Sequence, residues 1–251
     1  MRILITGATG GIGSHIIKEL QGKDYIITAH GRNDNALKKL AKKYGIKTLK
    51  ADLSKEKGLN TLCNYAKKNN IDVLINNAGV LYMQDFANSD TKTIDNTIDV
   101  NITALIKTTH KILPLMLKRN SGRIVNIGSV VGSIGLPYFA VYCASKYAVK
   151  GFSESLHREL YDTNVNITYI APRGVDTPMI SNKERKVFKA MLSSYDSPEY
   201  VAKQIVKAIE NNKTRLTIGL LEKLSCGING AFPTITDMFF WLIRNLIKKE
   251  I

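Results

Sequence analysis

The sequence predicts an α/β fold, a single doubly wound domain whose parallel sheet carries helices on both faces. Two observations lead to this prediction. Short apolar runs alternate along the chain with longer stretches of helical periodicity, and repeated β-α units form parallel sheets that are covered on both sides. No low-complexity linker or internal repeat divides the 251 residues, a length that one large domain accommodates.

The elements are expected in strict alternation. The apolar runs predict strands at residues 3–6, 25–29, 47–51, 72–76, 123–128, 165–171 and 215–219. Helical periodicity predicts helices at residues 11–20, 34–44, 55–68, 93–117 and 142–160. Ser197 and Pro198 begin a further helix as cap and first residue. Pro114 is expected to bend the last turns of the helix at 93–117. Right-handed crossovers then place ligands beyond the carboxyl ends of the strands.

The net charge of +15 is unusual for a chain of otherwise ordinary composition, with 44% apolar residues. It favours anionic partners. The lysines are scattered, however, often as pairs on helix surfaces, and no basic stripe is interleaved with aromatic residues. We therefore expect no nucleic-acid partner.

The cysteines indicate a reducing compartment. Cys63, Cys143 and Cys226 are widely spaced and odd in number, and no spacing typical of metal ligands occurs, so we expect free thiols and no metal site. Only three apolar residues precede the first glycine turn, too few for a signal peptide. No apolar run approaches the roughly 18 residues that span a bilayer. A cytoplasmic location is expected.

A glycine-rich turn, Thr6-Gly7-Ala8-Thr9-Gly10-Gly11-Ile12-Gly13, joins the first predicted strand to the first helix. Such a turn lets backbone approach a pyrophosphate closely, and the helix N-terminus offers free N–H groups to it. The spacing fits both a 7-11-13 and a 7-10-13 glycine pattern and does not separate them. At this strand–helix junction the turn predicts a dinucleotide site.

The residues after the second strand predict which dinucleotide is bound. An acidic side chain there would bind both ribose hydroxyls of NAD, but none occurs at residues 30–33. Arg32 would instead pair with a 2′-phosphate, so NADP(H) is preferred over NAD(H). A solvated surface arginine, with Asp34 nearby, is the alternative interpretation.

Tyr142 and Lys146 stand four residues apart and share one helix face. An unperturbed tyrosine has a pKa of about 10, which a nearby ammonium would lower. By itself this spacing is a common accident. Ser129, at the end of the fifth strand, could hold a carbonyl oxygen, and the segment Asn76-Asn77-Ala78-Gly79 ends the fourth strand. Asn101 in the long helix has a propensity cost there.

From Ile3 to about Met179 the chain closely resembles the short-chain dehydrogenase/reductase family. The resemblance rests on the order and spacing of the glycine turn, Asp52-Leu53, Asn76-Asn77-Ala78-Gly79, Asn101, Ser129, Tyr142, Lys146 and Thr177-Pro178-Met179. We expect a single Rossmann-type domain over residues 1–251. Residues 1–179 would form the cofactor-binding and catalytic core, and residues 180–251 would supply substrate-side helices and an amphipathic C-terminal helix.

The resemblance also implies roles for the residues. Tyr142 would be the general acid in reduction and the base in oxidation, while Lys146 lowers its pKa and binds the nicotinamide ribose. Ser129 would position the carbonyl, and Asn101 would support a water relay. The cofactor-binding residues are then Gly7, Thr9, Gly11, Ile12, Gly13, Arg32, Asp52, Leu53, Asn77, Ala78, Gly79, Tyr142, Lys146, Pro172, Val175 and Thr177.

The implied activity is hydride transfer between NADP and a ketone or secondary alcohol, by a homodimer or tetramer. The family usually has glycine after Pro172, where this chain has Arg173. Contact with a cofactor phosphate or an anionic substrate group, and exposure to solvent, are equally compatible with an arginine at this position.

The C-terminal segment is amphipathic in a way that leaves its partner open. At 100° per residue one broad apolar face is formed by Ile235, Met238, Phe239, Leu242, Ile243, Leu246 and Ile247. Asp237, Arg244 and Lys248 lie opposite, with Phe240 and Trp241 at the boundaries. Such a helix suits a membrane surface, a partner subunit or the rim of the substrate pocket. Each of these favours a hydrophobic or lipid-like substrate.

Two other functional hypotheses remain open. An extended-type sugar-nucleotide epimerase or dehydratase shares the tyrosine–lysine pair, but it generally has a larger C-terminal domain than the roughly 75 residues here allow. A non-catalytic NADP-binding regulator would not need the complete set of tyrosine, lysine, serine and asparagine.

Overall fold

The computed structural model describes residues 1–191 and 194–251. Within these residues a seven-stranded sheet has the order β3-β2-β1-β4-β5-β6-β9, with every neighbouring pair parallel. The strands are β1 (Arg2–Ile5), β2 (Ile26–Gly31), β3 (Lys47–Lys50), β4 (Val73–Asn76), β5 (Gly122–Ile127), β6 (Val165–Ala171) and β9 (Arg215–Thr217). A small second sheet pairs β7 (Gly174–Val175) with β8 (Tyr195–Asp196). The predicted fold class is confirmed.

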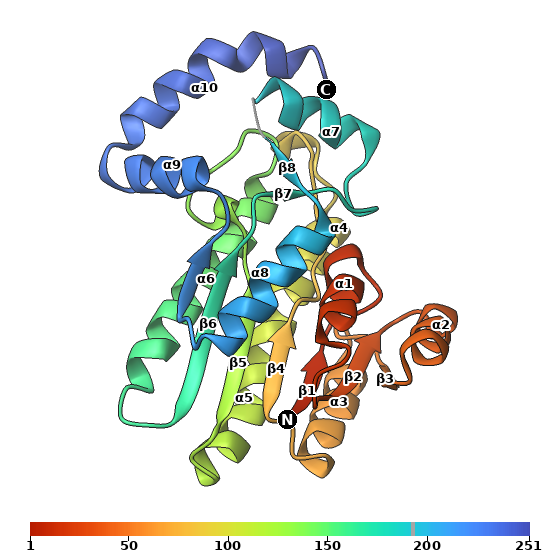
Figure 1. Cartoon of the computed structure of the whole chain (residues 1–251). Helices are drawn as coiled ribbons and strands as arrows, with labels where there is room; N and C mark the ends of the chain where they lie inside the picture. Colours follow the sequence, from red (N-terminus) through yellow and green to blue (C-terminus); the bar gives the residue numbers. More distant parts are fainter. Residues whose placement is uncertain (192–193) are drawn as a thin grey trace.

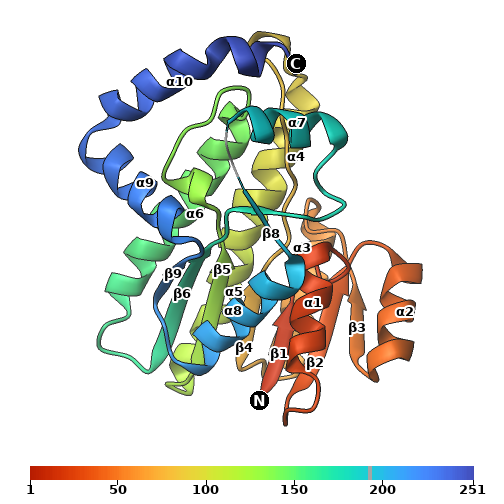
Figure 2. The ribbon, with the colours of Figure 1, turned by 45° about the horizontal axis from the view of Figure 1, so that its top comes forward.

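Helices cover both faces of the large sheet (Figures 1 and 2). They are α1 (Gly11–Leu20), α2 (Asp34–Tyr44), α3 (Glu56–Lys68), α4 (Thr91–Ile98), α5 (Ala104–Lys118), α6 (Ala140–Glu159), α7 (Asn182–Ala190), α8 (Pro198–Glu210), α9 (Leu220–Ala231) and α10 (Pro233–Lys248). Short 3₁₀ turns lie at Phe86–Asn88 and Val130–Gly132. Helices α1, α2 and α8 pack on one face, and α3, α5 and α6 on the other.

The central strands are apolar on both sides because both faces of the sheet are covered. Ile3 and Ile5 of β1 enter the core cluster beneath α1 and α8, whereas Leu4 enters the cluster beneath α3 and α5. All three side chains are fully buried. Successive residues of a strand point to opposite faces, so a continuous apolar run fills two cores at once.

The single helix expected at residues 93–117 is interrupted. A π-helical turn, Asp99–Thr103, separates α4 from α5. Such a turn inserts one residue into the helical repeat and is frequent at functional sites. Hydrophobic periodicity does not reveal it because the apolar pattern continues on both sides.

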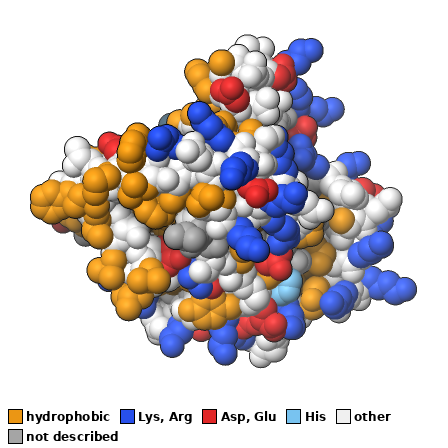
Figure 3. Space-filling model, turned by 90° about the horizontal axis from the view of Figure 1, so that it is seen from above, with side chains coloured by type: hydrophobic (Ala, Val, Ile, Leu, Met, Phe, Trp, Pro, Cys, Tyr) orange, Lys and Arg blue, Asp and Glu red, His pale blue; other side chains and the backbone are white. Residues whose placement is uncertain are grey.

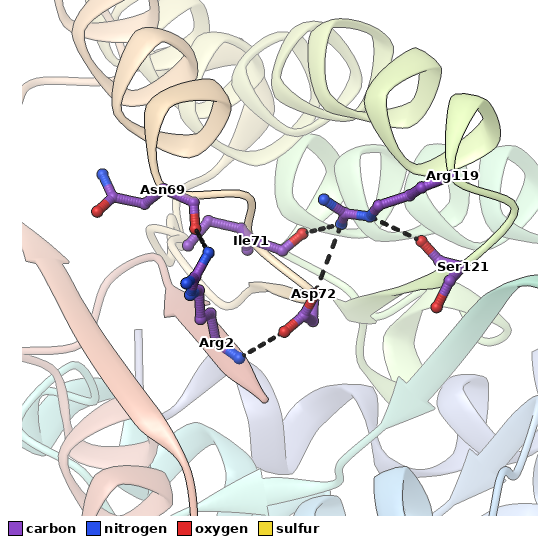
Figure 4. Close-up of polar contacts among 6 residues, drawn as sticks. All are labelled: Arg2, Asn69, Ile71, Asp72, Arg119 and Ser121. Carbon is purple, nitrogen blue, oxygen red and sulfur yellow. Dashed lines mark hydrogen bonds and ion pairs between the residues drawn. The ribbon is translucent and has the colours of Figure 1, made fainter.

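A polar cluster ties the amino ends of β1 and β4 together, at the end of the sheet away from the glycine turn (Figure 4). The Arg2 backbone N–H donates to Asp72 Oδ2 at 2.8 Å, and the Arg2 guanidinium donates to the Asn69 carbonyl at 3.0 Å. The Arg119 guanidinium donates to the Ile71 carbonyl and lies 3.9 Å from Asp72 Oδ1. These contacts join the amino ends of the strands, whereas the glycine turn lies at the opposite, carboxyl end of the sheet.

Helices α9 and α10 form an arm that arches over the carboxyl edge of the sheet and returns to α7 (Figures 1 and 2). The broad apolar face expected for the last helix is divided between protein contact and exposure. Phe240, Ile243 and Ile247 pack inward, whereas Met238 and Leu242 are about 60% exposed. The apolar arc of the helix is wider than its area of contact with protein, so only part of the arc is buried. Among the described residues, no helix is long and apolar enough to cross a bilayer.

Candidate active site

The glycine turn joins β1 to α1, and three of its glycines determine its shape. Gly7 has a φ of +62°, a left-handed conformation that favours glycine. A Cβ at Gly13 would lie 2.6 Å from the Gly7 carbonyl oxygen, and one at Gly11 would lie 2.4 Å from Thr177 Cγ2. A Cβ at Gly10 would meet only the Gly7 oxygen, at 3.3 Å. The crowding therefore favours the 7-11-13 glycine pattern.

Thr6 and Asn77 fasten this turn to the carboxyl end of β4. Thr6 Oγ1 accepts hydrogen bonds from the backbone N–H groups of Asn77 and Ala78, each at 3.0 Å. The Asn77 amide donates to the carbonyls of Thr6 and Gly7 at 3.0 and 3.1 Å. The turn and the segment after β4 thus form one rigid wall. The glycine motif alone does not indicate this role for Thr6, the threonine with which the motif begins.

Tyr142 and Lys146 lie on α6, on the same face as their spacing predicts. The Lys146 ammonium is 5.7 Å from the centre of the Tyr142 ring. Lys146 Nζ donates to the Ile127 carbonyl at 3.2 Å, and the residue is 7% exposed. Helix α6 therefore presents a phenol and a buried cation side by side.

Burial sets the protonation of both groups. It raises the pKa of Tyr142 above its ordinary value, Cys143 adds to that rise, and the hydrogen bond with Ser129 acts in the lowering direction. Burial lowers the pKa of Lys146 to about 8. The pKa of Tyr142 is therefore shifted in the direction opposite to the lowering expected from Lys146, and burial is the largest cause.

Ser129 follows β5, and hydrogen bonds hold both its hydroxyl group and its backbone carbonyl. Its hydroxyl accepts from the Val131 N–H at 3.3 Å and donates to the Pro172 carbonyl at 3.4 Å. The Tyr169 hydroxyl donates to the Ser129 carbonyl at 3.1 Å. A Cβ at Gly128 would lie 2.2 Å from the Tyr169 ring. Tyr169 therefore positions the Ser129 backbone, a role that no motif in the sequence indicates.

Asn101 lies in the π-helical turn and is 2% exposed. Its Oδ1 accepts from the Val80 N–H at 2.8 Å, and its Nδ2 donates to the Val80 carbonyl at 2.9 Å. Nδ2 also donates to Ser145 Oγ at 3.0 Å, and Ser145 Oγ donates to the Tyr142 carbonyl at 2.7 Å. Asn101 thus links the segment after β4 to the helical turn that carries Tyr142. Ser145, like Thr6, was missed.

A cavity of about 610 Å³ connects these parts. Its walls come from the glycine turn, the ends of β4, β5 and β6, helix α6, and the apolar side chains of α7, α9 and α10. Ten of the predicted residues line it: Gly11, Ile12, Asn77, Gly79, Ser129, Tyr142, Lys146, Pro172, Val175 and Thr177. Gly7, Gly13, Ala78 and Asn101 do not line it. Residues 10–12 of the glycine turn line the cavity, where a phosphate could approach their backbone closely.

The remaining predicted residues follow the carboxyl ends of three strands: Thr9 follows β1, Arg32 follows β2, and Asp52 and Leu53 follow β3. Thr9 packs against Gly31, whose added Cβ would lie 3.0 Å from Thr9 Cγ2, so the exposed Arg32 follows directly beside the turn. Burial acts to raise the pKa of Asp52, but hydrogen bonds from Ser54 and the charge of Arg32 outweigh it and lower that pKa. Leu53, 6% exposed, packs in the core with α3. The structure gives Leu53 a packing role.

Comparison with known proteins identifies the family to which this arrangement belongs. Residues 1–187 match the family described as short chain dehydrogenase.

The chain belongs to the short-chain dehydrogenase family.

Relatives of this short-chain dehydrogenase support an oxidoreductase. Nodulation protein G of Rhizobium sp. (strain N33) is 34% identical over 197 residues, which cover 77% of this chain and 80% of that protein. Ketoacyl reductase HetN of Nostoc sp. (strain PCC 7120) is 31% identical over 251 residues, covering 95% and 87%. A solved structure of serine dehydrogenase complexed with NADP⁺ is 29% identical, with a TM-score of 0.78, and covers 87% of this chain and 94% of its own.

Arg173 departs from the short-chain dehydrogenase pattern, and the structure gives it a contact that neither interpretation from the sequence named. Its guanidinium lies 2.7 Å from Asp196 Oδ1 and 3.1 Å from Glu222 Oε1. The hydrogen bonds to these two carboxylates raise the pKa of Arg173. The side chain is therefore not free in solvent. It joins β8 and α9 to the start of β7 at the wall of the cavity.

Proposed function

We propose that the protein transfers a hydride between NADP(H) and a hydrophobic ketone or the corresponding secondary alcohol. The observation that carries this proposal is the shared cavity, which brings Ser129, Tyr142 and Lys146 to the same space as the bare backbone of the glycine turn. Its outer walls are mostly apolar side chains of α7, α9 and α10. The kinship with a ketoacyl reductase over 95% of the chain supports a ketone with an attached apolar chain.

The chemistry divides between the cofactor and the chain. The nicotinamide supplies or accepts the hydride when it is bound. Tyr142 donates a proton to the carbonyl oxygen in reduction and removes it from the alcohol in oxidation. Ser129 donates a hydrogen bond that orients that oxygen. Lys146 holds the ribose through its ammonium group, and Asn101 steadies the turn of α6 that carries Tyr142 and supports the proton relay.

The preference for NADP(H) rests on Arg32. No acidic side chain competes for the ribose at residues 30–33, and the serine dehydrogenase that holds NADP⁺ in its solved structure is 29% identical to this chain. A guanidinium pairs well with a phosphate because it presents two parallel donors. The location at the edge of the glycine turn supports contact with a 2′-phosphate.

The free thiols at residues 63, 143 and 226 support a cytoplasmic location. We also propose that the protein is a homodimer or tetramer, as the family resemblance implies. A second subunit or a lipid surface would then contact the exposed apolar side chains of α9 and α10.

The catalytic proposal is tested with Tyr142→Phe. Loss of the general acid should reduce turnover of hydrophobic ketones by about 10²–10⁴-fold, measured as NADPH consumption at 340 nm, while the dissociation constant for NADPH stays within a few-fold. Tyr147→Phe, on the same helix but outside the cavity, is the matched control and should retain full activity. Unchanged turnover in Tyr142→Phe would reject the assignment.

The cofactor proposal is tested with Arg32→Ala. Removing the partner of the 2′-phosphate should weaken NADPH binding by roughly tenfold or more and leave NADH binding nearly unchanged. Lys39→Ala, an exposed cation on α2, should alter both only slightly. Equal losses for the two cofactors would contradict a phosphate contact.

A further inference from the structure

The outward surfaces of α9 and α10 expose large apolar side chains that no described residue covers. Leu220, Leu224, Phe232, Met238, Trp241, Leu242 and Leu246 are each between 53% and 74% exposed. None of them lines the cavity. Figure 3 shows hydrophobic side chains gathered on the side of the molecule where these two helices lie, with lysine and arginine side chains beside them. We call these seven side chains the outer apolar surface.

The same two helices are apolar on their inner side as well. Leu221, Ile228, Ile235 and Phe239 line the cavity. Phe240, Ile243 and Ile247 pack on the cluster around α7. A helix in contact with water on one side keeps that side polar. On α10 the polar side is formed by Asp237, Arg244 and Lys248, and the apolar arc beside it is wider than its contact with protein. Such a wide arc is expected where its remaining part meets a second apolar phase.

The cavity continues onto this surface. Its wall residues Leu221, Ile228, Ile235 and Phe239 keep between 37% and 72% of their area exposed. They lie on the same helices as the outer apolar surface, so one apolar path runs from the outside to Tyr142. A hydrophobic substrate could follow this path without crossing water.

The charges of this part of the chain favour a lipid surface over a second copy of the chain as the partner of the outer apolar surface. Residues 220–251 carry Lys223, Arg244, Lys248 and Lys249 on the exposed side. Of their three acidic residues, Glu222 is already paired with Arg173. The whole chain carries a net charge of +15, so two copies meeting here would bring like charges together, whereas anionic headgroups would attract them.

Trp241 and Arg244 have the form of an interfacial anchor. The Arg244 guanidinium lies 4.3 Å from the Trp241 ring centre, and Trp241 is 60% exposed. Amphipathic tryptophan beside a cation suits the boundary between headgroups and acyl chains. Nothing else among the described residues requires this pair to be outside.

We propose that α9 and α10 dock on an anionic lipid bilayer and open the cavity onto it, so that the ketone substrate enters from the membrane. The docking stands on the surface itself, and the route of the substrate rests on the function proposed above. The substrate class is thereby narrowed to membrane-resident amphiphiles with a carbonyl in an apolar chain.

The docking is tested by flotation of the full chain with vesicles of phosphatidylcholine and phosphatidylglycerol at 7:3, and with phosphatidylcholine alone. The variant Trp241→Ser/Leu242→Ser changes two side chains of the outer apolar surface and none of the cavity wall. It should reduce partition onto the anionic vesicles by roughly tenfold or more. The control Tyr161→Ser/Tyr200→Ser removes exposed aromatic side chains elsewhere and should partition like the unmodified chain. High salt should weaken the binding.

Failure of the unmodified chain to float with anionic vesicles, or equal flotation of the Trp241/Leu242 variant, would overturn the proposal. A dimer of the unmodified chain that becomes a monomer in that variant, measured by sedimentation velocity, would assign the surface to a second copy instead. Turnover of a short water-soluble ketone should be equal in the two proteins, whereas turnover of a vesicle-embedded ketone should fall in the variant. Loss of all ketone turnover would count against the proposed function and leave the flotation result standing.

Discussion

Replacing Arg173 by methionine should destabilise the protein and loosen α9, because it leaves two carboxylates without their cation. The side chains of Arg173, Asp196 and Glu222 are 23%, 8% and 19% exposed. Removing one partner of a buried ion pair costs about 3–5 kcal/mol. Since the guanidinium keeps part of its surface in water, we expect the lower end, about 3 kcal/mol. In a chain of this size that lowers Tm by roughly 6–12 °C.

The measurement is thermal unfolding by circular dichroism. The control is Arg185→Met, which breaks the 2.6 Å pair with Asp176, where the side chains are 35% and 59% exposed. Exposed pairs contribute at most about 1 kcal/mol, so this control should lose only a few degrees. Adding Asp196→Asn and Glu222→Gln to Arg173→Met removes the unpaired charges and should recover much of the loss. A Tm for Arg173→Met no lower than that of the control would refute the reasoning.

Two further predictions concern the cofactor end of the cavity. Gly11→Ala places a Cβ 2.4 Å from Thr177 Cγ2 and should cost about 1–3 kcal/mol in urea unfolding, whereas Gly10→Ala should be nearly neutral; equal effects would contradict the 7-11-13 pattern. Because the pKa of Lys146 is lowered to about 8, NADPH binding measured by calorimetry should weaken as the pH rises through 8. The stability of the folded protein should rise between about pH 8 and 10.5, because in this range the unfolded chain still holds the proton that the folded chain has lost. Lys146→Met should abolish both trends, and binding in the unmodified chain that does not change from pH 7 to 9.5 would reject the assignment.

The central fold could be predicted because its causes are local. The strand β6, residues 165–171, and the helix α2, residues 34–44, were predicted with both ends correct. A strand covered on both faces must be apolar throughout, and α2 carries its own stop signal in Gly45, which adopts a left-handed φ of +64°. Other strand ends moved by one or two residues, where a ladder hydrogen bond rather than a side chain decides the boundary.

The residue types of the candidate site could be predicted, but the contacts that hold these residues in place could not. Tyr142 and Lys146 share a face because a helix has 3.6 residues per turn. The pKa of Tyr142 depends on burial by segments distant in sequence, and it was predicted in the wrong direction. The backbone contact of Tyr169 with Ser129 joins β6 to the end of β5. Such contacts arise only once the sheet has assembled, so no local pattern contains them.

The last helix shows where a helical wheel stops being informative. A wheel assigns one apolar face to one partner, whereas the broad apolar face of α10 is shared between two surroundings. The structure places Phe240, Ile243 and Ile247 against the cluster around α7, which accounts for one face only. Met238, Trp241 and Leu246 remain exposed on the same helix whose Ile235 and Phe239 line the cavity. The proposed docking on an anionic bilayer would give these side chains an apolar environment that the described chain does not supply. In that proposal the substrate enters from the same bilayer, so the specificity of the cavity and the docking of α9 and α10 depend on one lipid surface.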